Sequence, residues 1–193
     1  MITFYLKHPK AVCTNRRVSL VTLMLLSIAA LTFSSCSKDK GGAAPAQNYY
    51  FRANVGGKKI DFHTVNFQGG GNDDRWEQIV IGGYETSYPT TQGAQVPPSL
   101  DFEIWRLGGN IGPGTYATPA EQEMIARYAI QTKDGTQVYN TSNGDDVFTV
   151  NIETISKKGI KGTFSGTVRD INGNAISITE GVFDLPYETI VNP

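Results

Sequence analysis

The chain has 193 residues, with 17 Lys+Arg against 18 Asp+Glu and a formal net charge of −1. This length allows one ordinary domain beside a targeting segment. The charged residues before Cys36 are all basic (Lys7, Lys10, Arg16 and Arg17), and without these four the remainder has 13 basic and 18 acidic residues, a net charge of −5. A mildly acidic surface disfavours binding to a phosphate backbone, so we expect no nucleic-acid partner.

Cysteine and histidine are scarce after the first 35 residues. Cys13 and His8 lie in the basic and apolar leader, which leaves Cys36 and His63 as the cysteine and histidine of the remaining sequence. With Cys36 at its start, the remaining sequence has no cysteine pair for a disulfide and no set of thiols for a zinc site. We therefore expect no metal site and no cofactor.

The leader has the three parts of an export signal in their usual order. A basic stretch ends at Arg16-Arg17, an apolar run of 16 residues covers positions 18–33, and Ser34-Ser35 precede Cys36. The run is slightly shorter than the roughly 17–25 residues that span a bilayer as a helix. We therefore predict a cleaved signal peptide over residues 1–35.

The stretch LTFSSC resembles a lipobox, the motif that lipoprotein signal peptidase recognises, although Phe33 stands where Leu is usual. The resemblance implies a diacylglyceryl group on the thiol of Cys36. The alternative is an ordinary secretory signal followed by an incidental cysteine. Two inserted acyl chains suffice for stable anchoring without a transmembrane helix.

Residues 36–47 form the lipidated cysteine and a flexible tether, because the sequence SKDKGGAAPAQ after Cys36 is small and polar without apolar periodicity. Ser37 after the cysteine resembles lipoproteins that are passed on to the outer membrane, and the charges that follow it resemble the start of Bacteroidota-type lipoproteins. The resemblance implies an outer-membrane, lipid-anchored protein on the periplasmic or the cell-surface face.

Residues 48–188 have the alternating pattern of half-buried strands. Phe51 and Val55 alternate with polar neighbours, Gly56-Gly57 indicates a turn, and Ile60 and Phe62 follow on the return, which predicts a hairpin. About nine strands are expected, and they cover residues 51–55, 60–63, 76–84, 100–105, 127–132, 137–141, 148–153, 160–168 and 176–185.

The change of apolar parity between Ile178 and Phe183 predicts a β-bulge at Glu180-Gly181. A short helix is expected over residues 118–124, where Thr118 would cap the first turn and Pro119 would open it. Short strands with a turn every 8–12 residues favour an antiparallel, jelly-roll-like β-sandwich, with a closed β-barrel as the alternative.

The segments YYFRANVGGKKIDF, GPGTY, FTVNIETI, GIKGTFSGTV and ITEGVFDLP resemble small Bacteroidota-type lipoproteins with β-sandwich domains. The resemblance covers about residues 49–186. Because its signature residues are glycines and core apolar residues, it implies a fold and no particular chemistry.

Catalytic and calcium motifs are incomplete in the sequence. His63 is predicted to lie on the exposed face of the first hairpin, and no Gly-x-Ser-x-Gly elbow is present. Residues 170–174 begin like an EF-hand loop, but Ala175 and Gly181 occupy the positions that require Gly and Glu. A hairpin turn is the favoured interpretation of this segment, while oxygen-rich loops at residues 72–74 and 143–146 leave calcium open.

The sharpest ligand hypothesis is a carbohydrate platform. Trp105 is predicted to share a strand face with Asp101 and Glu103, so that its ring could stack on a sugar while the carboxylates accept hydroxyl hydrogens. Trp76 and Tyr84 would extend this platform from the preceding strand. The alternative is that Trp105 covers the sheet edge or packs under the following loop.

These features predict a membrane-anchored, non-enzymatic lipoprotein with no catalytic residues, whose β-domain binds a glycan or another envelope protein. One alternative is a carbohydrate-binding module that uses Trp105, Asp101 and Glu103. A more remote alternative is a hydrolase with paired carboxylates.

Overall fold

The computed structural model describes residues 48–71, 75–119 and 123–188. The predicted signal peptide, Cys36 and the tether lie outside these residues. No helix within them is long and apolar enough to cross a membrane. They form eleven antiparallel strands and one short 3-10 turn: β1 (Tyr50–Val55), β2 (Lys58–Asp61), β3 (His63–Gly70), β4 (Gln78–Tyr84), β5 (Ser99–Trp105), β6 (Gly114–Thr118), β7 (Met124–Thr132), β8 (Gly135–Asn140), η2 (Thr141–Asn143), β9 (Phe148–Ser156), β10 (Gly159–Arg169) and β11 (Ala175–Pro186).

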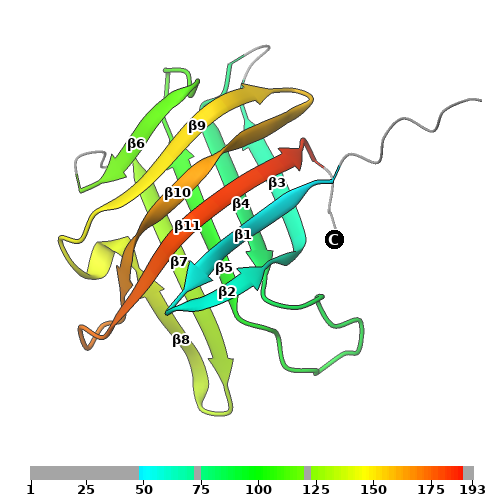
Figure 1. Cartoon of the computed structure of the whole chain (residues 1–193), viewed down its shortest axis with the longest axis vertical. Coiled ribbons are helices and arrows are strands. Elements are labelled where there is room, and N and C mark those ends of the chain that lie inside the picture. Colours follow the sequence, from blue (N-terminus) through cyan, green and yellow to red (C-terminus); the bar gives the residue numbers. More distant parts are fainter. Residues whose placement is uncertain (1–47, 72–74, 120–122, 189–193) are drawn as a thin grey trace, which may run out of the picture. The chain divides into compact units, whose positions relative to one another are not determined.

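The strands form two packed layers (Figure 1). The front sheet has the order β2-β1-β11-β10-β9-β6, and the back sheet has the order β3-β4-β5-β7-β8. The two join at one corner through the pair Arg169↔Asn140, and the sheet is not closed into a barrel. The prediction of an antiparallel β-sandwich is confirmed, and the alternative of a closed barrel is wrong.

The interior is built from the alternating apolar residues that the sequence indicates. Phe51, Ala53 and Val55 of β1 are buried, and so are Leu100, Phe102 and Ile104 of β5. Because side chains on a strand alternate between its two faces, each strand gives one apolar row to the interior. Five phenylalanine rings meet between the layers, from Phe51, Phe102, Phe148, Phe164 and Phe183.

The predicted bulge in β11 is confirmed. Glu180 has a φ of 53°, and the β10–β11 register shifts between Phe164 and Gly166. The β1–β11 register shifts between Arg52 and Asn54, opposite the same segment. The extra residue lets both Ile178 and Phe183 point into the interior, which a regular strand would not allow.

The predicted helix over residues 118–124 is wrong in its described part. Thr118 ends β6 and Met124 begins β7, with turn residues next to each, and residues 120–122 lie outside the described part. The Thr118 hydroxyl accepts a hydrogen bond from the backbone N–H of Phe148 at 3.2 Å. It therefore joins β6 to β9 and caps no helix.

Two strands were not predicted. β3 begins at His63, directly after the first hairpin, and its residue Thr64 has a φ of 46°, so the alternation is interrupted at its start. β6 has five residues, of which Tyr116 is its one large apolar residue. Strand propensity is weak in such short, irregular segments, and pairing with β4 and β9 determines their conformation.

Candidate functional site

The predicted carbohydrate platform lies on the outer face of the back sheet. Asp101, Glu103 and Trp105 alternate with three buried residues along β5, as expected, and all three are half-buried. Trp105 lies opposite Gln78 of β4 in the strand register. The structure thus brings the three predicted residues together on one face.

Both carboxylates of this face are engaged by an arginine of the next strand. Arg127 of β7 donates a hydrogen bond from Nε to Oδ1 of Asp101 at 2.7 Å, and its Nη2 lies 3.5 Å from Oε2 of Glu103. Gln78 donates to the other oxygen of Glu103 at 2.5 Å. We call Gln78, Asp101, Glu103 and Arg127 the Arg127 cluster. It occupies part of the roughly four acceptor sites of each carboxylate and offsets part of their negative charge.

The structure places the two other predicted platform residues, Tyr84 and Trp76, in different environments. Tyr84 lies on the same face, next to Tyr88 at a ring distance of 4.9 Å, and its pKa is raised by burial and by the nearby Tyr88 and Asp101. Trp76 does not extend the platform, because its side chain is 4% exposed and packs against Phe67 and Tyr187. Trp76 is therefore a core residue, and the prediction that it extends the platform is wrong.

A hydrolase would need one of two neighbouring acids to carry a proton. Burial raises the pKa of Asp101, and the hydrogen bond and charge of Arg127 oppose that shift. The two acids lie beside one arginine on an outward sheet face, with a hollow of about 120 Å³ next to Asp101. A pocket for a drug-sized ligand is ordinarily about 300–1,000 Å³, so this surface offers a substrate little enclosure.

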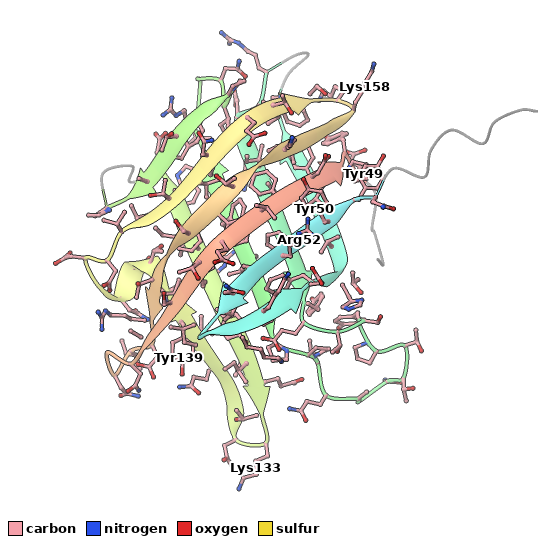
Figure 2. The ribbon with its side chains drawn as sticks, in the orientation of Figure 1. Tyr49, Tyr50, Arg52, Lys133, Tyr139 and Lys158 are labelled. Atoms are coloured by element: carbon pink, nitrogen blue, oxygen red, sulfur yellow. The ribbon has the colours of Figure 1, made fainter. Side chains whose placement is uncertain are left out.

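A larger hollow lies at the other side of the sandwich, where β1 begins and the chain turns from β2 into β3. It has a volume of about 590 Å³ and is lined by residues 48–52 and 61–63. We call these residues the β1 hollow. Figure 2 shows Tyr49, Tyr50 and Arg52 gathered at the start of β1. Its volume is in the ordinary range of small-molecule sites.

The β1 hollow exists because two strands separate there. The Phe62 N–H donates to the Phe51 carbonyl at 2.8 Å, and beyond this bond the chain leaves the front sheet for β3. The buried rings of Phe51 and Phe62 lie 4.8 Å apart and form the base of the hollow. The outward side chains Tyr50 and Arg52 then face the segment of Asp61.

Arg52 has an unusual environment in this hollow. It lies directly opposite Asp61 in the β1–β2 ladder, yet its guanidinium carbon sits 4.5 Å from the centre of the Tyr50 ring. Within residues 48–71, 75–119 and 123–188, no ion pair involves Arg52 or Asp61. The hollow therefore presents a cation held on an aromatic ring and a separate carboxylate.

The segment that resembles an EF-hand loop is a hairpin turn between β10 and β11. The buried Asp170 accepts hydrogen bonds from the backbone N–H groups of Asn172 and Asn174 at 2.9 and 2.8 Å. Its other oxygen accepts from the side chains of Asn174 and Gln137 at 2.7 and 3.1 Å. Four protein donors thus occupy this carboxylate, and the turn explains the sequence pattern.

Of the two other oxygen-rich loops, the structure describes the one at residues 143–146. Asp146 forms a double contact with Arg169, with Oδ1 3.0 Å from Nη2, and residues 72–74 lie outside the described part. In the part of the chain that the structure describes, no three His, Cys, Asp or Glu side chains gather closely enough to hold a metal ion.

Asp170 gives a prediction about acid stability. Hydrogen bonds, of which that from the Asn174 side chain is the largest cause, lower the pKa of Asp170. Its stabilising contribution is therefore complete above the ordinary aspartate pKa of about 3.9 and is lost as the pH falls below it. We expect Asp170→Ala to lower the melting temperature at pH 7, and this difference should shrink below about pH 4.

Thermal unfolding followed by circular dichroism between pH 2.5 and 7 measures this effect. Asp134→Ala is the matched control, because Asp134 also lies at a hairpin turn but its side chain is 79% exposed. A constant difference between Asp170→Ala and the unsubstituted chain at every pH would contradict the role given to the carboxylate.

The β1 hollow was not predicted from the sequence, although one of its features follows from a turn that is close by in the sequence. The Gly56-Gly57 turn fixes the hairpin register, which places Arg52 opposite Asp61. The preference of Arg52 for the Tyr50 ring, and the departure of β3, depend on the folded arrangement. Comparison with protein-family models, with curated proteins and with solved structures finds no significant match to this chain.

Proposed function

We propose that this protein is a lipid-anchored envelope protein whose β-sandwich binds a glycan in the β1 hollow without chemical conversion. The observation that carries the proposal is the presence in one hollow of a guanidinium held on a ring, Arg52, and a carboxylate, Asp61, that forms no ion pair within the described residues. Sugar hydroxyls both donate and accept hydrogen bonds, so a site with donors and acceptors around an apolar base suits them.

The anchor in this proposal is the thiol of Cys36, which follows the apolar run and Ser34-Ser35. Diacylation there would hold the protein on the outer membrane, at its periplasmic or cell-surface face, since two acyl chains anchor stably. The membrane is thus one partner, and the glycan, on its own or on another envelope protein, is the other.

The anchor is tested by Cys36→Ala in cells that are fed labelled palmitate. We expect the label on this protein to disappear and the protein to move from the membrane fraction to the soluble fraction. Cys13→Ala is the matched control, because it removes the cysteine of the predicted leader. Undiminished labelling of Cys36→Ala would show that the lipid is not on this thiol.

The binding function is tested with the full-length chain, purified in detergent, on an array of neutral and acidic glycans. We expect binding that Tyr50→Ala abolishes while circular dichroism shows a retained fold. Trp105→Ala should leave binding unchanged. An array on which no glycan binds would refute the glycan-binding proposal.

A second candidate site is the predicted platform at Trp105. It is supported by the position of Trp105, Glu103 and Asp101 on one face of β5. The engagement of both carboxylates by Arg127 argues for the β1 hollow instead. Loss of array binding in Trp105→Ala, with binding intact in Tyr50→Ala, would favour this second surface.

A further inference from the structure

We propose that the β1 hollow selects acidic sugars, with the guanidinium of Arg52 binding the oxyanion of a carboxylate or sulfate group. This inference rests on the proposed glycan-binding function and specifies its ligand class. The acidic group of the sugar would give the exposed Arg52 an ion-pair partner, which the described part of the chain does not supply.

The ring of Tyr50 limits the orientations that the Arg52 side chain can adopt. A free arginine side chain is flexible, but a guanidinium that lies flat on an aromatic ring is held in place and still presents its N–H edge. The guanidinium carbon of Arg52 lies over the Tyr50 ring, 4.5 Å from its centre, which is within the range of a cation–π contact. Tyr50 is thus a positioning residue, and Arg52 is the group that contacts the anion.

Arg52 has no ion-pair partner among the described residues. Five other arginine or lysine side chains of the described residues have a carboxylate within reach: Lys58 pairs with Glu85, Arg127 with Asp101, Lys133 with Asp134, Lys161 with Glu153 and Arg169 with Asp146. Arg52 has Asp61 directly across the ladder, but no ion pair joins them. The planar fork of arginine matches a carboxylate or sulfate with two parallel hydrogen bonds.

Other polar side chains of the β1 hollow suit the uncharged part of an acidic sugar. Asp61, His63 and Asn48 line the same hollow and can hydrogen-bond to ring hydroxyls. Asp61 would repel an anion placed beside it, so the oxyanion must lie at the Tyr50 side and the hydroxyls at the Asp61 side. A free inorganic anion would gain from the first side alone, whereas an acidic sugar uses both.

The test includes one pair of probes that share a sugar backbone and differ in charge, beside a sulfated oligosaccharide and a free anion. The full-length chain in detergent is titrated calorimetrically with tetragalacturonate, with its neutral methyl ester, with a chondroitin sulfate tetrasaccharide and with inorganic phosphate. We expect at least one of the two acidic oligosaccharides to bind, the methyl ester to bind at least roughly tenfold more weakly than tetragalacturonate, and phosphate to bind weakest. Binding should weaken as salt is added.

Substitutions then assign the effect to Arg52. Arg52→Gln should lower the affinity for the acidic oligosaccharide by roughly 10-fold to 100-fold and that for the neutral methyl ester by much less, because the amide still donates hydrogen bonds but carries no charge. Arg52→Lys should recover part of it, because lysine keeps the charge but not the fork. Lys133→Gln is the charge-matched control, since Lys133 is exposed at the tip of the β7–β8 hairpin, away from the β1 hollow (Figure 2).

Tyr50 is tested by its own pair of variants. Tyr50→Phe keeps an aromatic face and should retain selectivity for the acidic sugar, whereas Tyr50→Leu should lose it while thermal unfolding stays unchanged.

The outcomes separate this inference from the glycan-binding proposal. Equal affinity for tetragalacturonate and its methyl ester would overturn acidic selectivity and leave glycan binding in place. Binding of phosphate as strong as that of the acidic oligosaccharides would overturn the sugar part of the inference. Failure of all four probes, together with a blank glycan array, would overturn both.

Discussion

Replacing Phe102 by alanine is expected to lower the free energy of unfolding by about 3–5 kcal/mol. Phe102 is the ring of the back sheet that lies among four rings of the front sheet. Its centroid is 5.3 Å from Phe164, 5.7 Å from Phe183, 6.1 Å from Phe51 and 6.4 Å from Phe148. Alanine would leave a cavity between the two layers that neither sheet can close.

Urea unfolding of the full-length chain in detergent, followed by tryptophan fluorescence, measures this loss. A domain is typically stable by about 5–15 kcal/mol, so the change is a large share of the total. Leu107→Ala is the control. Because Leu107 is 83% exposed, this substitution should change the free energy of unfolding by no more than about 0.5 kcal/mol. Equal effects of the two substitutions would mean that Phe102 does not join the layers.

Gly162→Ala is expected to destabilise the chain by about 1–3 kcal/mol, although it adds a single methyl group. Gly162 lies in the buried row of β10, where the ring of Phe183 passes over it. A Cβ atom built there would lie 2.6 Å from Cζ of Phe183 and would also collide with the carbonyl oxygen of Asn151. Since that oxygen belongs to β9 backbone, the strands would have to move apart.

Gly70→Ala is the matched control. Gly70 also lies in a strand, but a Cβ atom built there meets no atom within 4 Å. The same urea titration should show a clear loss for Gly162→Ala and little change for Gly70→Ala. If the Gly162 variant were as stable as the unsubstituted chain, the close approach of β9, β10 and β11 would be wrong.

The sequence predicted strands well where apolar and polar residues alternate over six or more positions, as in β5 and β10. It also located the bulge in β11, because the change of parity is a local signal. It failed at β3 and β6, which are short or irregular. It also failed at the described ends of the expected helix over residues 118–124, where capping preferences suggested a helix but pairing of Thr118 with Phe148 determines the strand end.

The candidate site was predicted less well, because its decisive contacts join distant residues. The outward face of Asp101, Glu103 and Trp105 follows from alternation along one strand. Its engagement by Arg127 requires the pairing of β5 with β7, which no local pattern reveals. Burial of Trp76 likewise depends on Tyr187, more than a hundred residues later in the chain.

The most direct test of the ligand site is a map of the residues that a bound glycan perturbs. Amide spectra of the full-length, isotope-labelled chain in detergent micelles would be recorded during titration with the tightest-binding glycan of the array. We expect the shifted amides to cluster in residues 48–52 and 61–63. A cluster centred on Asp101, Glu103 and Trp105 of the opposite sheet would contradict the assignment of the ligand to the β1 hollow.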